Sequence, residues 1–423
     1  MRRGIAATAL VATLALAATA CGGDSDGPSK GSGGELSGEV TWWDTSTVGS
    51  EDKVFKKIAA DFTKKHPKVT VKYVSVPFGD AQNKFKNAAQ AGSGAPDVMR
   101  ADVAWTPDFA DLGYLAPLDG TTALKNAGDF LPQAAASTKY KDKTYAVPQV
   151  IDSMGIFYNK KMLKDAGVEV PRSIPELKAA AKKIKEKTGK TGMYLRGDDA
   201  YYFLSFLYGE GGDLVDAKNK KVTVDGPAGV KAFQVVKDLV ASGTAKTDAG
   251  DGYENQQKAF KSGDVAMMIN GPWALSDTYT GDQFKDRANL GIAPVPAGSV
   301  KQGAPQGGHN LGVYAGSKNL DASYAFVEYM SSAEVQTKVA KELSLLPTRT
   351  SVYSQPDVAK NADVAFFKPV VEKAVERQWI PENGSLFEPL KVQYSNVLTG
   401  QSTPEAGAKA TGDAYRKLLK GWK

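Results

Sequence analysis

Apolar positions along the first hundred residues switch between the period of a strand and the period of a helix. Val69, Val71 and Tyr73 alternate with Thr70 and Lys72, which is the two-residue period of a strand. The same criteria predict strands over residues 39–44 and 69–73, a third strand beginning at residues 95–99, and helices over residues 51–65 and 81–91. Strands that alternate with helices favour an α/β fold, with helices covering a parallel sheet.

The middle of the chain repeats this alternation. A helix is predicted over residues 173–187, because Ser173 can cap it, Pro175 lies in its first turn and Glu176 completes a capping box. Gly189 is placed to end this helix. Further predictions are a buried aromatic helix over 201–208, a helix over 254–262, a strand over 265–269, a helix over 334–343 with a capping box of Ser331 and Glu334, and a mainly helical last hundred residues.

Length and composition restrict the class of protein. The chain has 423 residues, which suggests two lobes, and 42% apolar and 24% charged residues are typical of a soluble globular protein. The formal charge is +6, and removal of Arg2 and Arg3 with a leader would leave 6 − 2 = +4. Lysines and acids are interspersed along the chain, so we expect no nucleic-acid partner.

The first residues have the pattern of an export signal. Arg2 and Arg3 precede an apolar run over residues 5–17, which is too short for a good membrane span. Small residues then precede Cys21, an arrangement that resembles the lipobox of bacterial lipoproteins, although Leu is commoner there than Ala18. Cys21 is the only cysteine, so we expect a lipidated residue rather than a free thiol, after a signal peptide of residues 1–20 and before a flexible tether of residues 21–38.

Seven segments in order along the chain carry a resemblance to a known family. They are residues 40–43, 62–71, 95–105, 145–160, 259–273, 307–311 and 346–349. Together they resemble the carbohydrate-binding branch of the extracellular solute-binding proteins of ABC importers, the group that includes maltodextrin-binding protein. The resemblance implies a type II, two-lobed α/β fold whose lobes close around a ligand in the cleft between them.

The resemblance also implies the boundaries of the two lobes and the partners of the protein. We expect hinge crossings near residues 148–151, 293–296 and 330–332. Lobe 1 then contains residues 39–147 and 294–330, and lobe 2 contains residues 148–293 and 331–423. The expected partners are an oligosaccharide, the permease of an ABC importer with a separate ATPase, and the extracellular face of the cell membrane through Cys21. The expected state is a monomer without cofactor.

A sugar presents apolar ring faces and many hydroxyl groups, so its site needs aromatic surfaces and planar polar groups. Trp273 follows a Gly-Pro turn; the family resemblance gives it a stacking role on sugar, and a loop anchor on the core is the alternative. Trp42 and Trp43 point to opposite sides of their strand, so we assign Trp43 to the cleft and Trp42 to the core. Other candidates from the resemblance are Asp44, Asp102 and Trp105 at strand ends; for Asp44 a cap or turn role, and for Trp105 a packing role, are the alternatives.

Further candidates follow in the second half of the chain. Asp152 lies just past the first expected crossing, where a carboxylate can accept from sugar hydroxyls or serve hinge structure. Gly308 allows close approach of the backbone to a ligand, while His309 stands where relatives have an aromatic or small residue. Arg349 suits two hydroxyl groups or a structural ion pair. Gln82 and Trp379 are weaker candidates.

Several functions compete on this evidence. The leading hypothesis is a carrier, not an enzyme, for maltose or maltodextrin-type oligosaccharides, with trehalose or cellobiose as alternative ligands. A secreted glycoside hydrolase using Asp44, Asp102 and Asp152 is the alternative from another class. A binder of peptide, iron or another anion is a third interpretation, but iron would need clustered Tyr and His. Two histidines and one cysteine predict no metal site, and the sequence has no Walker or dinucleotide motif.

Overall fold

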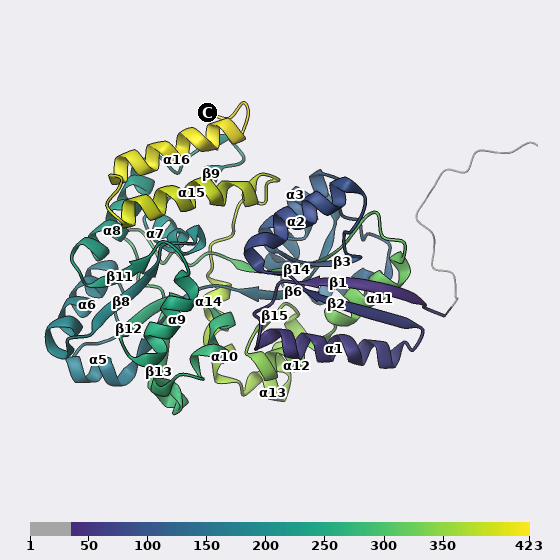
Figure 1. Ribbon diagram of the computed structural model, residues 1–423, viewed down its shortest axis with the longest axis horizontal. Helices are drawn as coiled ribbons and strands as arrows, with labels where there is room; N and C mark the ends of the chain where they lie inside the picture. Colours follow the sequence, from purple (N-terminus) through teal and green to yellow (C-terminus); the bar gives the residue numbers. More distant parts are fainter. Residues whose placement is uncertain (1–34) are drawn as a thin grey trace, which may run out of the picture. The chain divides into compact units, whose positions relative to one another are not determined.

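A computed structural model describes residues 35–423, so the expected signal peptide, Cys21 and most of the expected tether lie outside the described residues. Strands of the first main sheet are β1 (Gly38–Asp44), β2 (Val69–Ser75), β3 (Val98–Asp102), β6 (Ala146–Asp152), β14 (Gly307–Val313) and β15 (Leu346–Pro347). Strands of the second are β7 (Gly155–Asn159), β8 (Thr191–Arg196), β11 (Ala245–Asp248), β12 (Val265–Asn270) and β13 (Leu290–Pro294). Their orders are β15-β6-β14-β3-β1-β2 and β11-β8-β12-β7-β13, which Figure 1 shows as two separate sheets.

Helices and short hairpins complete the fold. The helices are α1 (Glu51–Lys65), α2 (Phe78–Ala91), α3 (Thr106–Asp111), α4 (Pro132–Ala136), α5 (Lys160–Ala166), α6 (Ile174–Thr188), α7 (Leu204–Gly209), α8 (Pro227–Ala241), α9 (Gly252–Ser262), α10 (Leu275–Thr278), α11 (Leu320–Met330), α12 (Ala333–Leu343), α13 (Pro356–Ala359), α14 (Ala362–Glu372), α15 (Asn383–Leu398) and α16 (Pro404–Leu418). The hairpins are β4 (Lys139–Tyr140) with β5 (Lys143–Thr144), and β9 (Val215–Asp216) with β10 (Lys221–Val222). The predicted two-lobed α/β class is confirmed, because each sheet carries its own set of helices.

The first sheet confirms the strand and helix periods expected from the sequence. β1 pairs in parallel with β2 and β3, while β14 runs antiparallel between β3 and β6. Trp42 is fully buried in the core on one side of β1, and Trp43 is partly exposed on the other side. Helix α1 has the predicted bounds and buries Phe55, Ile58 and Phe62. Trp42 and Trp43 therefore lie on opposite sides of β1 as predicted, with Trp43 beside the cluster that includes Trp105.

Two element boundaries in this region differ from the predictions. Helix α2 begins at Phe78, three residues before the predicted start at residue 81. Strand β3 begins at Val98 rather than at residues 95–97. Pro96 has no N–H to give to a ladder, and the Asp97 side chain accepts a hydrogen bond from Thr41 N at 2.8 Å. Asp97 also makes backbone bonds to Thr41 and Tyr314, both at 2.9 Å, so its side chain adds to the pairing just before β3.

The predicted start and stop of helix α6 are confirmed, with one change in the hydrogen bonds. Ser173 Oγ accepts from Glu176 N at 3.4 Å, and Gly189 ends the helix with a left-handed φ of 69°. The Glu176 carboxylate accepts from Arg172 N at 2.8 Å. A capping box would direct that carboxylate to Ser173 N instead, so the reciprocal bond is displaced by one residue.

The predicted capping box of Ser331 and Glu334 is wrong. Ser332 is the N-cap of α12, because its hydroxyl accepts from Val335 N at 3.3 Å. The Ser331 hydroxyl donates to Glu328 O at 3.2 Å, in the last turn of α11. Two adjacent serines thus serve two different helix ends, which the spacing in the sequence does not distinguish.

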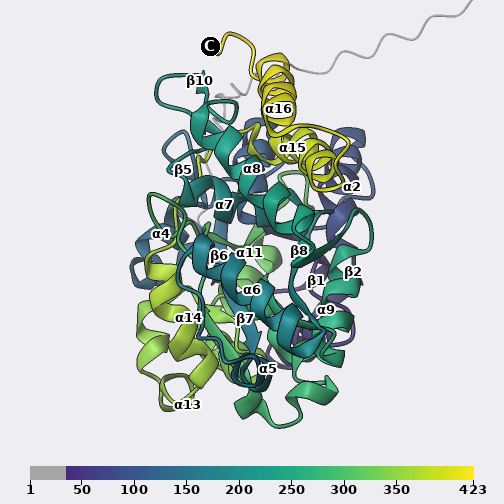
Figure 2. The same ribbon diagram turned by 90° about the vertical axis from the view of Figure 1, so that its left-hand side faces the viewer.

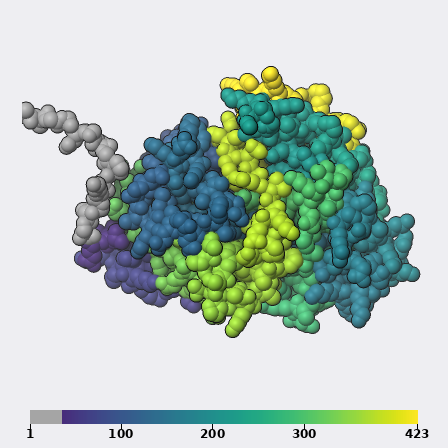
Figure 3. Space-filling view, turned by 180° about the vertical axis from the view of Figure 1, so that it is seen from behind, coloured from purple at the N-terminus to yellow at the C-terminus, as the bar shows by residue number. Residues whose placement is uncertain are grey.

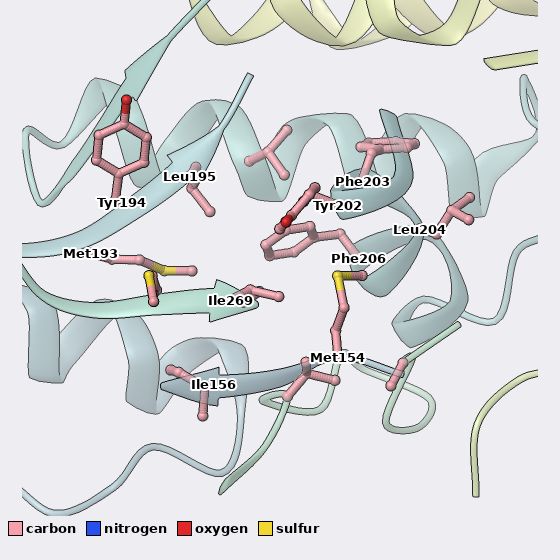
Figure 4. Close-up of a cluster of buried hydrophobic side chains, with 14 of the residues drawn as sticks. Met154, Ile156, Met193, Tyr194, Leu195, Tyr202, Phe203, Leu204, Phe206 and Ile269 are labelled. Atoms are coloured by element: carbon pink, nitrogen blue, oxygen red, sulfur yellow. The ribbon is translucent and has the colours of Figure 1, made fainter. Parts of the chain in front are cut away.

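The second sheet packs against an aromatic core. The expected buried segment over residues 201–208 forms a short 3-10 helix, η4 (Ala200–Phe203), that continues into α7. Phe203 and Phe206 from this segment lie near Met154 and Ile269 in the cluster that Figure 4 shows. Helices α15 and α16 lie against each other and against α8, as Figure 2 shows. Among the helices that the structure describes, none is long and apolar enough to cross a membrane.

The chain passes between the sheets near two of the expected crossings, and the second passage overlaps the expected residues 293–296. β6 stays in the first sheet up to Asp152, and β7 enters the second sheet at Gly155, so the first passage is Ser153 and Met154 rather than residues 148–151. The second passage spans residues 295–306, between β13 and β14. No passage occurs at residues 330–332, because α12 packs on the core of the first sheet and β15 pairs with β6. Sheet membership therefore extends the first lobe through residue 347.

Candidate functional site

Polar and aromatic side chains come together where strands of the first sheet end and elements of the second lobe approach them. Asp102 ends β3 and Asp152 ends β6, and the ladder register places His309 beside Asp102 and Gly307 beside Asp152. Trp273, in the 3-10 helix η5 (Pro272–Ala274) after β12, packs against the cores of both sheets. A side chain that contacts both cores lies between the two lobes, so these strand ends and Trp273 define the candidate cleft.

Asp152 is a buried carboxylate that accepts no hydrogen bond from any of the described residues. Asp152 is only 7% exposed. Burial and the nearby Asp102 carboxylate raise the pKa of Asp152 to about 8, against the opposing effects of Arg100 and Arg377. A carboxyl group without partners in such surroundings is ready to bond to a ligand that brings hydroxyl groups.

Gly307 makes room for this carboxylate. A Cβ atom on Gly307 would lie 2.2 Å from Asp152 Oδ1 and 2.4 Å from the Tyr201 hydroxyl oxygen. The Tyr201 hydroxyl donates to Pro305 O at 3.4 Å, and its ring lies 6.3 Å from the Trp273 ring. The absence of a side chain at residue 307 therefore lets an acidic, a phenolic and an indole group share one region.

Asp102 contacts a residue that the sequence analysis missed. Asp102 Oδ1 accepts from Ala104 N at 2.8 Å and lies 3.6 Å from Arg377 Nη1. Burial raises the pKa of Asp102, and Arg377 opposes that rise. Arg377 is only 4% exposed, with its guanidinium 5.7 Å from the Tyr201 ring centre and 4.9 Å from the Phe387 ring centre. No sequence motif marks Arg377, which is separated from Asp102 by 275 positions in the chain.

Aromatic surfaces flank these polar groups. The ring of Phe78, at the start of α2 and 45% exposed, stacks on Trp105 at 5.1 Å. Trp273 lies over its own turn, because a Cβ on Gly271 would come within 2.0 Å of the indole. Trp43 is partly exposed and packs beside the cluster that includes Trp105. The candidate cleft thus offers flat apolar faces from both lobes.

His309 lies in β14 with both ring nitrogens buried and without hydrogen-bond partners among the described residues. Burial, and then the positive charge of Arg100, hold the pKa of His309 well below its usual range, so the ring is neutral. Its ring is 6.0 Å from that of Phe78, in an edge-to-face arrangement. The preceding Gly308 has a φ of 133°, and a Cβ there would lie 2.3 Å from Val150 O. A side chain at residue 308 would therefore displace the strand that carries His309.

Asp44 has its bonding capacity filled within the first lobe. It is fully buried and accepts from the Tyr73 hydroxyl at 2.7 Å, from Ser46 N at 3.2 Å and from the Ser46 hydroxyl. Arg100 Nε lies 3.7 Å away. These contacts fit the turn role that was the alternative for Asp44 in the sequence, and they leave its contact with ligand a prediction.

Arg349 is also occupied by the protein itself. It is 3% exposed, and its guanidinium donates to Ser331 O at 2.6 Å and Asn126 O at 2.8 Å while packing 4.1 Å from the Phe130 ring centre. A cavity of about 510 Å³ borders Arg349 on the side of Glu328 and Asn126. The N–H groups of Arg349 are thus already bonded to backbone carbonyls, unlike the side chain of Asp152, and its ligand role stays a prediction.

Two weaker candidates lie at the margin of the cleft. Gln82 Nε2 donates to Asp108 at 3.1 Å, and a Cβ on Gly384 would come within 2.5 Å of Gln82 Nε2. Trp379 Nε1 donates to Glu376 at 3.0 Å. The Gln82 contact brings the start of α15 directly against the first lobe. Figure 3 shows the same closeness from behind, with the yellow-green C-terminal part running between the blue and green parts of the surface.

Comparisons with known proteins agree with this architecture. The family model of bacterial extracellular solute-binding protein matches residues 46–337. The diacetylchitobiose binding protein DasA of Streptomyces coelicolor is 27% identical over 99% of this chain and 99% of its own length. The maltotriose-binding protein of Pyrococcus abyssi is 27% identical over 86% of this chain and 78% of its own length.

Solved structures extend the comparison. The GacH receptor of Streptomyces glaucescens, studied unliganded and in complex with acarbose and an acarbose homolog, is 66% identical, with a TM-score of 0.90. That match covers 92% of this chain and 100% of the other chain. Maltose-bound MalE3 of T. maritima is 27% identical with a TM-score of 0.80, covering 90% of this chain and 99% of the other. Both similarities cover both sheets of the fold.

Proposed function

We propose, since the chain belongs to the bacterial extracellular solute-binding proteins, that it captures maltose or maltodextrin-type oligosaccharides and delivers them to the permease of an ABC importer. The observation that carries the ligand class is the convergence of unpartnered polar groups with aromatic faces. Asp152 and Arg377 are 7% and 4% exposed, respectively, and lack hydrogen-bond partners among the described residues, beside Tyr201 and Trp273. The polar atoms of both residues are therefore open to hydrogen bonds with a bound ligand.

The chemistry of a sugar fits these groups. A carboxylate accepts hydrogen bonds from hydroxyl groups, and a guanidinium donates to hydroxyl oxygens. The apolar face of a pyranose ring can lie on Trp273 or on the stacked pair of Phe78 and Trp105. A site with both features rejects ligands that lack the matching hydroxyl groups, because the buried polar groups then stay unpaired.

The relatives support a saccharide ligand without fixing which one. The ligands of these relatives are diacetylchitobiose, maltotriose, acarbose and maltose. The relative at 66% identity is the one studied with acarbose, and it favours α-linked, glucose-like oligosaccharides for this chain. Trehalose and cellobiose are the alternatives within the same family.

The remaining features of the proposal concern the cellular location of the protein and the closure of its lobes. We propose that the protein is a monomeric carrier without catalytic activity, exported by residues 1–20 and held at the extracellular face of the membrane by a lipid on Cys21. A ligand that contacts both lobes favours the closed arrangement, which the permease then recognises. The proposed lobes are those of the sequence analysis, with β6, α12 and β15 moved to the first lobe.

Calorimetry of the purified protein tests the ligand class. Titration with maltose, maltotriose, trehalose and cellobiose should give saturable heat with at least the two α-1,4-linked sugars. Small-angle scattering should show a smaller radius of gyration at saturation. No heat with all four sugars would contradict the proposal. Shorter products after prolonged incubation with maltotriose, abolished by Asp102→Asn, would favour the glycoside hydrolase instead.

A further inference from the structure

Two arginines of this chain are equally buried but differ in what their N–H groups bond to. Arg349 is 3% exposed and Arg377 is 4% exposed. The N–H groups of Arg349 donate to the carbonyl oxygens of Ser331 and Asn126 at 2.6 and 2.8 Å. Arg377 donates to no described residue, since its Nη1 lies 3.6 Å from Asp102 Oδ1, beyond hydrogen-bond range. One buried arginine is therefore satisfied by the fold and the other is not.

The position of Arg377 directs these free donors into the cleft. The residue follows α14 in a segment whose Val375 N donates to Ala304 O at 2.8 Å, within the passage between the two sheets. The guanidinium lies 5.7 Å from the Tyr201 ring and 4.9 Å from the Phe387 ring, which fix its plane. Opposite it stands Asp102, at the end of β3 in the first sheet. Arg377 thus spans from the second lobe toward the first at the level of the candidate site.

The charges around Arg377 indicate which kind of ligand its free N–H groups can bind. Its positive charge faces two carboxylates, Asp102 and Asp152, and the ion-pair distance is short only to Asp102. Arg100, the other cation near these carboxylates, donates to Gln149 at 2.8 Å and lies beside Asp44. The free N–H groups of Arg377 therefore remain for an uncharged ligand that carries acceptor oxygens.

We infer that Arg377 is a specificity-determining residue that donates to two neighbouring hydroxyl oxygens of the bound sugar. The planar fork of a guanidinium matches two acceptors side by side, which an ammonium group cannot do. Asp102, at the end of β3 in the first sheet, lies within ion-pair range of the guanidinium at 3.6 Å. This inference rests on the proposed function. The match to the family model ends at residue 337. Arg377 lies after that residue, so it is not part of the matched family pattern.

The test compares sugar affinity in two variants of Arg377 and one control variant. Arg377→Met should lower the affinity for maltotriose by about tenfold or more, as expected for loss of hydrogen bonds to a charged group. Arg377→Lys keeps the charge and should recover only part of that loss. Arg416→Met, a control that removes an arginine paired with Asp225 at 2.8 Å on α16, should leave the affinity within about twofold of the wild type.

A deoxy-sugar series gives a readout that a purely structural role would not move. The wild type should lose affinity for one or two members of a monodeoxy-maltose series, and Arg377→Met should bind those members as well as it binds maltose. Full affinity in Arg377→Met or in Arg377→Lys would overturn the inference, as would equal losses in Arg377→Met and Arg416→Met. Wild-type protein that binds no sugar would refute the proposed function as well, whereas an unaffected Arg377→Met would refute this inference alone.

Discussion

An Asp152→Asn substitution replaces a carboxyl group by an amide of nearly the same size at the centre of the candidate site. The carboxyl is buried next to Asp102, and its pKa is raised to about 8 from an ordinary 3.8. A group whose pKa is raised on folding favours the folded state in its protonated form. The wild type therefore has the full stability contribution of this group below about pH 4, and loses it progressively as the pH rises to about 8.

The size of the effect follows from the same shift. One pH unit between the two pKa values changes the free energy of unfolding by about 1.4 kcal/mol. From about pH 5 to about pH 7, the wild type should therefore lose roughly 3 kcal/mol relative to Asp152→Asn, which has no carboxyl to ionise. Opening of the lobes, which would rehydrate Asp152, reduces this difference, so the value is an upper bound.

Urea unfolding of both proteins at about pH 5, 7 and 8.5 measures the difference directly. The variant should gain stability over the wild type as the pH rises, and saturating maltose should shrink the gain, because ligand hydroxyls donate to the ionised carboxylate. Asp165→Asn, which removes an exposed carboxylate on α5, is the matched control and should follow the wild type. Parallel curves for Asp152→Asn and the wild type would refute the reasoning that burial keeps this carboxyl protonated.

Three further substitutions test the site and the fold. Trp273→Ala should lower the affinity for maltotriose about tenfold or more in calorimetry without loss of secondary structure, and unchanged affinity would remove Trp273 from the site. Gly307→Ala should lower the affinity and the melting temperature, because the added methyl group meets the Asp152 and Tyr201 oxygens. The free energy of unfolding should fall by about 1–3 kcal/mol. Ser332→Ala should destabilise the protein by about 1 kcal/mol in urea titrations, and no change there would contradict its role as helix cap.

Local patterns in the sequence predicted much of the fold because each depends on neighbouring residues. The bounds of α1 and the opposite sides of Trp42 and Trp43 follow from periods of 3.6 and 2, and both are confirmed. The cap of α12 could not be resolved, because Ser331 and Ser332 both stand at an allowed spacing and only the path of the backbone decides between them. The last crossing was misplaced because the packing partner of α12 is not local in sequence.

The candidate site was less accessible from the sequence, since it depends on which polar groups remain unpaired. Asp44 and Asp152 both follow apolar strands, yet Asp44 is enclosed by Tyr73 and Ser46, whereas Asp152 has no partner among the described residues. Arg377 has no motif around it and becomes notable only when the fold brings it to Asp102. Hydrogen-bond satisfaction is a three-dimensional property, so residue type and spacing select candidates without ranking them.

The place of β14 in the first sheet has a consequence for the newly synthesised chain. β14 lies between β3 and β6, and all three strands belong to one sheet although residues 307–313 follow every strand of the second sheet. Until residue 313 has left the ribosome, the facing edges of β3 and β6 lack their shared neighbour and expose unpaired backbone groups. The five strands of the second sheet, by contrast, are contiguous between residues 155 and 294. The first sheet is therefore completed only after the second has been synthesised, and such long-range pairing slows folding.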